Sequence, residues 1–323
     1  MFRLDSDIRI NGIQFSRVES IKIEKDASRI DNVCTIKIPT TARIERGGEV
    51  ITEIETSKVF KSGDEVSISI GYDGNLREEF RGFVRKVHPK TPLEIECDDE
   101  IYLLRRKNLK ASFKNTTLKS LLEFIVKHTG IRLSENIPVI NFDVFYFKNI
   151  SAARALQKIK DEYGLTIYFR DWMELYVGVY NDNDGVQVKF STDVNINRQQ
   201  LEWVTEDDVR LKIKAINVRK NNTKQEIEFG DEDGEIRTIY FYNLSSKEDL
   251  RTKAKQELER IKYEGYRGSI TTFLLPVADV GNIAIYQDAD FPERSGRYLI
   301  DSSIITYSRD GGRRKIKLGV KIP

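Results

Sequence analysis

Apolar and polar side chains alternate with a period of two over much of this chain, a pattern typical of β-strands that bury one face. In the first part of the chain the alternation is clearest at 8–15, 18–23, 33–38, 66–70 and 93–97. An Asn-Gly pair inside the first of these runs favours a tight hairpin. We therefore expect residues 1–108 to form a small antiparallel β-barrel.

The pattern changes to helical spacing after this segment. Thr116 or Thr117 can cap a helix with a single apolar stripe, and Ser151 can cap a second helix that stops at Gly164. Short strand patterns lie between and after the two helices. A helix with one apolar stripe packs on a sheet, so residues 109–177 predict a compact α+β domain.

Strand patterns then return, with one interruption. The run 210–219 alternates but slips by one position, which predicts a β-bulge. Two strand patterns around an acidic turn, followed by a helix that Ser246 begins, predict a small hairpin–helix insertion at 226–269. We assign the flanking segments 178–225 and 270–323 to a second, discontinuous β-barrel. The predicted fold class is mainly β with α+β insertions: two similar antiparallel β-barrels plus two smaller α+β domains.

One short phrase occurs once in each predicted barrel. Gly63 opens the strand pattern Asp-Glu-Val-Ser-Ile-Ser-Ile, and Gly82 lies in the returning strand; Gly281 and Gly296 hold similar places near the end of the chain. Glycine suits positions that need a positive φ or a close backbone approach. We expect Gly63 to match Gly281, and Gly82 to match Gly296. A chain with two like barrels can present six similar faces as a trimer.

Composition and charge add limits to this picture. The 323 residues exceed the size at which one core stops growing, and 39% are hydrophobic while 32% are charged, as in globular proteins. The 53 basic and 51 acidic residues nearly cancel, which gives no general attraction to nucleic acid. We expect the clusters 105–107 and 313–315 to be rim charges. No apolar run reaches membrane-helix length and the N-terminus lacks a signal-peptide core, so we expect synthesis in a cytoplasm.

Candidate chemistry is sparse. Cys34 and Cys97 lie in strand patterns and are expected to be buried free thiols, while His88 and His128 have no cysteine or carboxylate at zinc-ligand spacing. The acidic turns 180–185 and 229–234 suggest calcium loops, but Tyr180 and Phe229 stand where the first acidic ligand belongs. No nucleophile motif is present. We predict no catalytic residue, no cofactor and no metal site.

Taken together, these features resemble the baseplate hub proteins of contractile phage tails and related injection systems. That family includes the late-control tail proteins and the hub half of type VI secretion spike proteins. The matching segments are 62–66 with 80–84, and 259–270 with 281–285 and 296–300. The second copy has Asn282 where the family usually has Asp, and the residues before it lack the usual proline.

The resemblance implies a structural hub without chemistry of its own: a homotrimer that adapts the sixfold tail tube to the threefold central spike. Its implied partners are the tail tube protein, the central spike protein and a baseplate wedge or tape-measure protein, with no membrane and no specific nucleic-acid binding. Its implied location is the virion tail baseplate or an assembled injection particle. The sequence leaves open whether the machine is a phage, a tailocin or a cellular injection system.

Two other classes remain open from the sequence. A tail-associated peptidoglycan hydrolase would need a cleft with a carboxylate of raised pKa or a metal. A carbohydrate-binding or adhesin module would need exposed aromatic side chains, for which Trp172 and Trp203 are the candidates.

Overall fold

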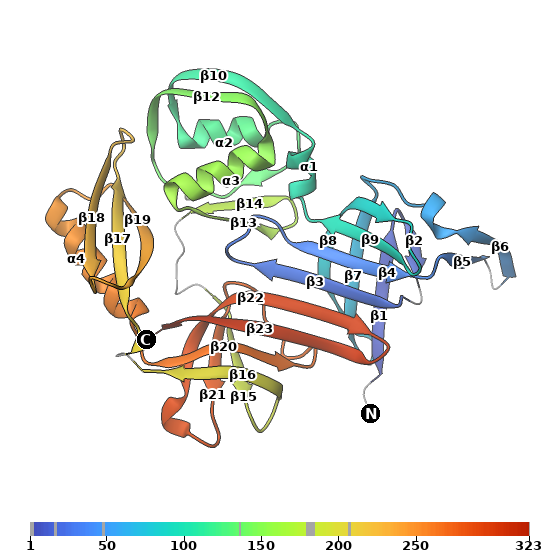
Figure 1. Ribbon diagram of the computed structural model, residues 1–323. Helices are drawn as coiled ribbons and strands as arrows, with labels where there is room; N and C mark the ends of the chain where they lie inside the picture. The colour runs from blue at the N-terminus through green and yellow to red at the C-terminus, as the bar shows by residue number, and fades with distance from the viewer. Residues whose placement is uncertain are drawn as a thin grey trace.

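The computed structural model describes residues 3–15, 18–46, 49–135, 137–178, 185–205 and 208–322 (Figure 1). Its N-terminal part is a barrel-like unit built from β1 (Leu4–Ile10), β2 (Ile13–Phe15), β3 (Ser20–Asp26), β4 (Val33–Ile38), β7 (Glu65–Tyr72), β8 (Asn75–His88) and β9 (Leu93–Asp98). Between β4 and β7 the chain forms a separate hairpin, β5 (Thr41–Arg46) and β6 (Glu49–Glu55), and a 3-10 turn, η1 (Thr56–Lys58). The alternation read from the sequence places isoleucines from β1, β3, β4, β7 and β9 in one buried core.

The α+β domain follows and packs on the first barrel. It contains α1 (Ile101–Arg105), β10 (Asn108–Thr117), α2 (Leu118–Val126), β11 (Arg132–Leu133), β12 (Asn141–Ser151), α3 (Ala152–Tyr163), β13 (Thr166–Asp171) and β14 (Glu174–Gly178). The long β10–β12 ribbon lies over α2 and α3, with β13 and β14 beneath them (Figure 1). The predicted caps are present: Thr117 and Ser151 accept backbone N–H bonds at the helix starts, and Gly164 takes φ 59° after α3.

The second barrel-like unit uses β15 (Gln187–Ser191), β16 (Ile196–Val204), β20 (Gly265–Thr272), β21 (Ile283–Gln287), β22 (Gly296–Ser308) and β23 (Gly311–Ile322), with a 3-10 turn, η3 (Pro292–Arg294). Between β16 and β20 the chain leaves it to form β17 (Leu211–Val218), β18 (Lys224–Gly230), β19 (Glu235–Tyr242) and α4 (Lys247–Ile261). This insertion stands beside the α+β domain, with α4 on its outer side (Figure 1).

The insertion begins earlier than the sequence pattern indicated. We assigned 211–218 to the second barrel, but β17 pairs with β18 and β19 in a separate sheet, and the barrel resumes at Gly265. The predicted bulge in this strand is wrong, since its pairing is continuous on both sides. The slip arises because both faces are buried: Leu211 and Ile213 face α4, whereas Ile216 packs into the α+β core.

Both barrels share one large sheet, because β22 of the second barrel pairs with β3 of the first. Cys34 and Cys97 are buried, free and opposite each other on β4 and β9. Among the described residues, no helix combines the length and the apolar character needed to cross a membrane.

The cap of α3 offers a test of the local structure. Substituting Ser151 by Ala removes the acceptor of the Arg154 N–H, which lies 3.3 Å from Ser151 Oγ, and should lower the free energy of unfolding by about 1 kcal/mol. Urea unfolding followed by circular dichroism measures the change. Lys158→Ala, on the exposed face of the same helix, should leave the midpoint almost unchanged; equal effects of the two substitutions would contradict the cap.

Candidate assembly site

The two glycine turns that open β7 and β21 make the same backbone hydrogen bonds. The N–H of Gly63 donates to Val84 O at 2.9 Å, and the N–H of Val84 donates back to Asp64 O at 2.8 Å. In the second barrel Gly281 donates to Ile300 O at 3.0 Å, and Ile300 donates to the carbonyl of the residue after Gly281 at 2.9 Å. Gly63 and Gly281 have φ values of 99° and 84°, a region that disfavours a side chain.

The Asp-to-Asn difference between the two copies preserves this turn. Asp64 Oδ2 accepts the backbone N–H of Lys61 at 2.9 Å, and Asn282 Oδ1 accepts that of Asp279 at 3.0 Å. Either side-chain oxygen therefore closes the turn three residues back. The departure from the usual Gly-Asp pair changes the charge and leaves the geometry intact.

The other two glycines are not equivalent, contrary to our expectation. With Gly63 matched to Gly281, the strand pairs Val66–Gly82 and Ala284–Tyr298 correspond, so Gly82 matches Tyr298. A Cβ at Gly82 would lie 2.2 Å from the carbonyl oxygen of Asp98, so close backbone approach requires glycine there. At Gly296 the nearest atoms belong to side chains, at 3.1 Å and beyond. The two sequence patterns therefore align at their first glycine and diverge by two residues at the second.

Strand order repeats between the barrels. The path β3-β4-β9-β8-β7-β1 of the first unit corresponds to β16-β20-β23-β22-β21-β15 of the second. One polarity differs: β1 runs antiparallel to β7, whereas β15 runs parallel to β21. Neighbouring strands thus occupy the same places in both units, apart from the direction of the last one.

The junction between the barrels is a run of antiparallel pairs from Ser302–Asp26 to Ser308–Ser20. Ile305 of β22 and Leu274, which follows β20, are buried in the core of the first barrel, although both come from the second half of the chain. Burying such side chains contributes about 1.5–3 kcal/mol each. The first barrel therefore depends on the second for part of its core.

An ion pair is enclosed at the same junction. Arg314 of β23 has no exposed surface, and its Nη2 lies 2.6 Å from Glu79 Oε1 on β8. The guanidinium also donates to the carbonyl oxygens of Leu274 and Ala278, at 3.3 and 3.0 Å. We had expected the cluster 313–315 to be rim charges, but its central residue is an internal link between the barrels.

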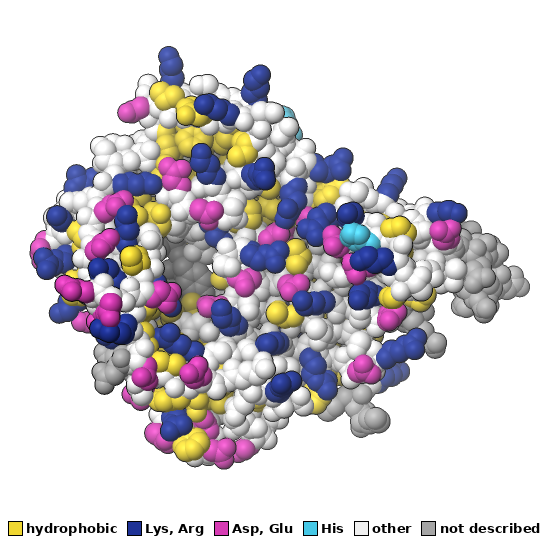
Figure 2. Space-filling view, viewed as in Figure 1, with side chains coloured by type: hydrophobic (Ala, Val, Ile, Leu, Met, Phe, Trp, Pro, Cys, Tyr) yellow, Lys and Arg dark blue, Asp and Glu magenta, His cyan; other side chains and the backbone are white. Residues whose placement is uncertain are grey.

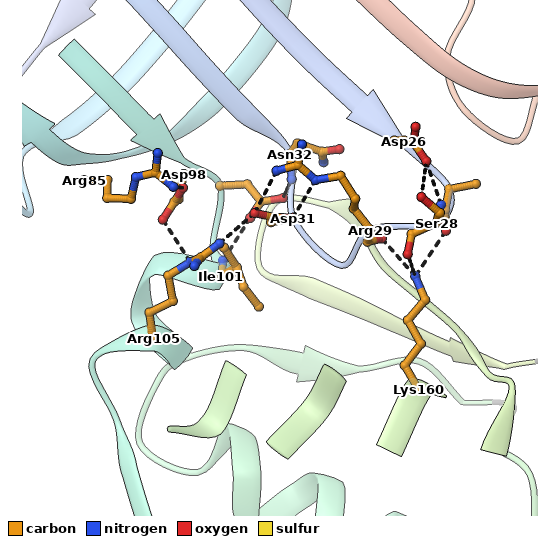
Figure 3. Close-up of polar contacts among 12 residues, drawn as sticks. Asp26, Ser28, Arg29, Asp31, Asn32, Arg85, Asp98, Ile101, Arg105 and Lys160 are labelled. Atoms are coloured by element: carbon orange, nitrogen blue, oxygen red, sulfur yellow. Dashed lines mark hydrogen bonds and ion pairs between the residues drawn. The ribbon is translucent and has the colours of Figure 1, made fainter. Parts of the chain in front are cut away.

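A polar network joins the first barrel to the α+β domain (Figure 3). Arg105 of α1 lies 2.6 Å from Asp31 Oδ2 and 3.0 Å from Asp98 Oδ2, and Arg85 of β8 lies 3.2 Å from Asp98 Oδ1. Lys160 of α3 donates to three carbonyl oxygens of the β3–β4 loop at 2.8–3.1 Å. The contacts of Arg105 and Lys160 cross between units, so they restrict the angle at which the α+β domain meets the barrel.

Three consecutive acids line the inner side of this network. Burial raises the pKa of Asp98 although Arg105 and Arg85 are close, and burial together with the charge of Glu100 raises the pKa of Asp99 well above its usual value. Asp99 accepts the backbone N–H groups of Asn32 and Ile101 at 2.7 and 3.0 Å. Burial also opposes the charge on Asp31, but the hydrogen bond and charge of Arg29 and the charge of Arg105 lower its pKa.

The structure brings together one group of side chains that could hold a metal and that the sequence analysis missed. Strand pairing places His88 opposite Glu94 and next to Glu96, and potential ligand atoms of these three residues lie within 4.8 Å of one another. Spacing along the chain does not indicate this group, because its members become neighbours only through the pairing of β8 with β9. Arg85 lies 2.9 Å from Glu96 and Lys90 lies 3.4 Å from Glu94, so cations already neutralise both carboxylates.

The other sequence-derived candidates have structural roles. In the turn 229–234, Asp231 accepts the N–H of Leu211 and pairs with Lys262 at 3.1 Å. The expected hairpin around this turn is wrong, because β18 and β19 pair with opposite edges of β17 and the turn carries the chain past the end of that strand. The turn 180–185 lies largely outside the described residues. Lys107, the last residue of the cluster 105–107, donates to three carbonyl oxygens at the end of α2. Lys107 therefore stabilises the end of α2, and the expected location of this cluster at a rim does not explain its contacts.

The two tryptophans lie on different units. Trp172 stacks with Arg81 at 4.2 Å and contacts Phe83, which ties the β13–β14 turn to the first barrel. Trp203 of β16 packs edge-on against Tyr266 and donates from Nε1 to Glu264 at 3.2 Å. On the face shown in Figure 2, basic and acidic side chains are interspersed, and apolar side chains gather over the β10–β12 ribbon, where Val144 and Tyr146 are more than half exposed. An apolar patch of this kind favours contact with another protein.

Solved structures of tail and secretion proteins share this architecture. The 43 kDa tail protein of prophage MuSo2 from Shewanella oneidensis has a TM-score of 0.64 and 14% identity, with 98% of each chain covered. A tail protein from Neisseria meningitidis has a TM-score of 0.63 and 16% identity, covering 99% of this chain and 96% of that one. A type VI secretion component of E. coli has a TM-score of 0.56 and 12% identity, covering 98% and 76%. No family model and no curated protein matches the sequence.

These likenesses extend over almost the whole chain, including both barrels and both smaller units. The chain therefore has the β-rich α+β fold of these phage tail proteins and of a type VI secretion component. The fold class expected from the sequence is confirmed.

The enclosed ion pair predicts a large effect of a single substitution. Glu79→Ala leaves the buried Arg314 without its carboxylate, which should lower the free energy of unfolding by about 3–5 kcal/mol. Arg77→Ala removes an ion pair whose arginine is half exposed and should cost less than about 1 kcal/mol. Denaturant titration of both variants measures the difference, and similar values would show that the Glu79–Arg314 pair is not desolvated.

The acids of the joint predict a pH dependence. Because the pKa of Asp99 is raised in the folded state, its contribution to stability is greatest below the unfolded value, about 3.9, and is lost as pH rises through the folded value. Asp99→Asn removes this loss, so the stability of the variant relative to wild type should improve between pH 4 and pH 8. Unfolding midpoints across that range measure the trend. A constant difference between Asp99→Asn and wild type across that range would refute the claim.

Proposed function

We propose that this chain is the structural hub of a phage-tail-like baseplate, a homotrimer that adapts a sixfold tail tube to a threefold central spike. The observation that carries the proposal is the repetition, within one chain, of a strand order and of a hydrogen-bonded turn. Three chains with two such barrels would supply six similar positions around an axis. The α+β domain and the insertion occur once per chain, so they would supply three.

The proposal includes the partners that such a hub needs. The tail tube protein would contact the ring of barrels, and the central spike protein would contact the opposite side, with a baseplate wedge or tape-measure protein as a further neighbour. The particle would be a virion tail baseplate or an assembled injection machine. The fold shared with tail proteins and with type VI secretion components supports this setting.

The two alternative functions have less support in the site. A peptidoglycan hydrolase needs a carboxylate of raised pKa in an open cleft, but Asp98 and Asp99 lie inside the joint against arginines and backbone N–H groups. A hollow of about 700 Å³ lies between the barrels and the β13–β14 hairpin, and neither residue lines it. A carbohydrate binder needs an exposed aromatic platform, whereas Trp172 and Trp203 are engaged with neighbouring side chains.

Oligomeric state is the direct test. We expect the purified chain to form a species of three copies at micromolar concentration, because obligate interfaces bury on the order of 2,000 Å² or more and do not dissociate readily. Native mass spectrometry and sedimentation velocity measure the number of copies without a partner present. A chain that stays monomeric over this range would count against the hub.

A further inference from the structure

The edges of β3 and β8 in the first barrel correspond to those of β16 and β22 in the second, and within the part of the chain that the structure describes only β3 and β22 pair with each other. The edge of β3 in the first barrel is occupied by the C-terminal half of β22 in the second. By strand order, the counterpart of β3 is β16, and the counterpart of β22 is β8. Among the described residues, β16 pairs only with β20, and β8 beyond Phe83 pairs only with β9.

We propose that, in the trimer, β8 of one chain pairs with β16 of the next and so repeats between chains the β22–β3 junction found within each chain. This inference rests on the proposed hub function and specifies how its ring closes. The contact is head-to-tail, since each copy offers β8 to one neighbour and β16 to the other, and such contacts close into a ring when the rotation permits. The partner that fits these edges is therefore a second copy of this chain.

The internal junction fixes the expected register. Val84 matches Ile300 through the shared turn bonds, and the pairs Val87–Ile95 and Ser303–Ile316 show that His88 matches Ile304. Ile95 of β9 pairs in turn with Ile36 of β4, and Ile316 of β23 pairs with Ile270 of β20.

The same comparison extends to the edge strands. Ile36 and Ile270 pair in turn with Ile21 and Gln199, so Glu24 of β3 matches Glu202 of β16. Within the chain Ile304 pairs with Glu24. His88 of one copy should therefore lie opposite Glu202 of the next.

Burial supports this register. Val87 packs on the core of the first barrel and Trp203 on the core of the second, while Lys86 and Glu202 are exposed. In the proposed pairing Val87 lies opposite Trp203, so inward side chains meet inward ones and outward meet outward. A shift of one residue would place Val87 opposite Glu202 and break this agreement.

Charge and length also fit a contact between chains. An imidazole opposite a carboxylate is a favourable cross-strand pair when the histidine is protonated, and the His88 ring is already held 3.2 Å from Glu96 on its own strand pair. Pro89 follows β8 and has no N–H to donate, so the run should end after the pairs of Lys86, Val87 and His88. The contact between chains is thus shorter than the internal one, which extends from Ser302 to Ser308.

Disulfide trapping tests the register in the full chain. The double variant H88C/E202C, oxidised after assembly, should give a covalent species of three chains on a non-reducing gel, because directly opposed strand positions meet the Cβ–Cβ distance of a disulfide. Mixed single variants H88C and E202C should give a two-chain species. The native Cys34 and Cys97 are at most 1% exposed and should not contribute.

Two controls use the same chemistry. E24C/I304C, a directly opposed pair of the internal junction, should form a disulfide within one chain. K86C/E202C places the thiols two positions out of register, at a diagonal separation of about 7–8 Å, and should cross-link at least about tenfold less. Equal cross-linking of K86C/E202C and H88C/E202C would overturn the register.

A measurement without new cysteines complements the trapping. E202K should raise the concentration at which trimers dissociate by up to about fivefold per contact, because it replaces the carboxylate opposite His88 by an ammonium. If the wild-type chain forms a trimer, but H88C/E202C gives no cross-link between chains and E202K leaves the dissociation concentration unchanged, the inference is overturned and the hub is left intact. A wild-type chain that forms no trimer would overturn the proposed function as well.

Discussion

The pairing of β22 with β3 is the constraint on which the architecture depends. It joins two strands that are separated by more than half of the sequence, and it carries Ile305 into the core of the first barrel. The buried Arg314–Glu79 contact lies at the same junction. It restricts the relative orientation of the two barrels, because a guanidinium enclosed in protein tolerates few arrangements of its acceptors. The barrels are therefore fixed as a pair, and they form a single rigid base for the two smaller units.

The α+β domain is held by a different kind of contact. Around it, charged side chains reach across to backbone carbonyls and carboxylates, as Lys160 does to the β3–β4 loop and Arg105 does to Asp98. The insertion closes the other side: Tyr240 donates to the carbonyl of Asp161 at 3.3 Å, and Tyr242 donates to that of Tyr163. Strand pairing and a buried ion pair join the barrels, whereas the α+β domain is oriented by polar contacts together with Ile30 and Ile216 in its apolar core.

Much of the fold could be predicted from local pattern. The caps at Thr117, Ser151 and Ser246 are set by residues next to the helices, and alternation located most strands of the first barrel. Prediction failed where a strand is buried on both faces, as at 211–218, because the period of two then disappears. It also failed for contacts between distant segments: nothing near Arg314 in the sequence indicates that Glu79 will enclose it.

Only part of the assembly site could be predicted from the sequence, again because strand pairing joins distant segments. The turn glycines Gly63 and Gly281 could be found because a positive φ restricts the residue type at one position. The place of the second glycine depends on the length of the turn between the paired strands and on a bulge at Glu79 in β8, where the pairing with β7 shifts, and neither leaves a clear mark in the sequence. Matching Gly82 with Gly296 by sequence pattern was therefore off by two residues.

The facing cysteines of β4 and β9 bear on how the protein withstands a change of redox environment. Burial raises the pKa of both the Cys34 and the Cys97 thiol, so neither forms appreciable thiolate near neutral pH. Since the thiolate is the form that reacts with oxidants and disulfides, both side chains should stay chemically silent while the protein is folded. A particle built in a reducing cell interior and used outside it would then keep the first barrel unchanged, without needing a disulfide to form or a reductant to prevent one.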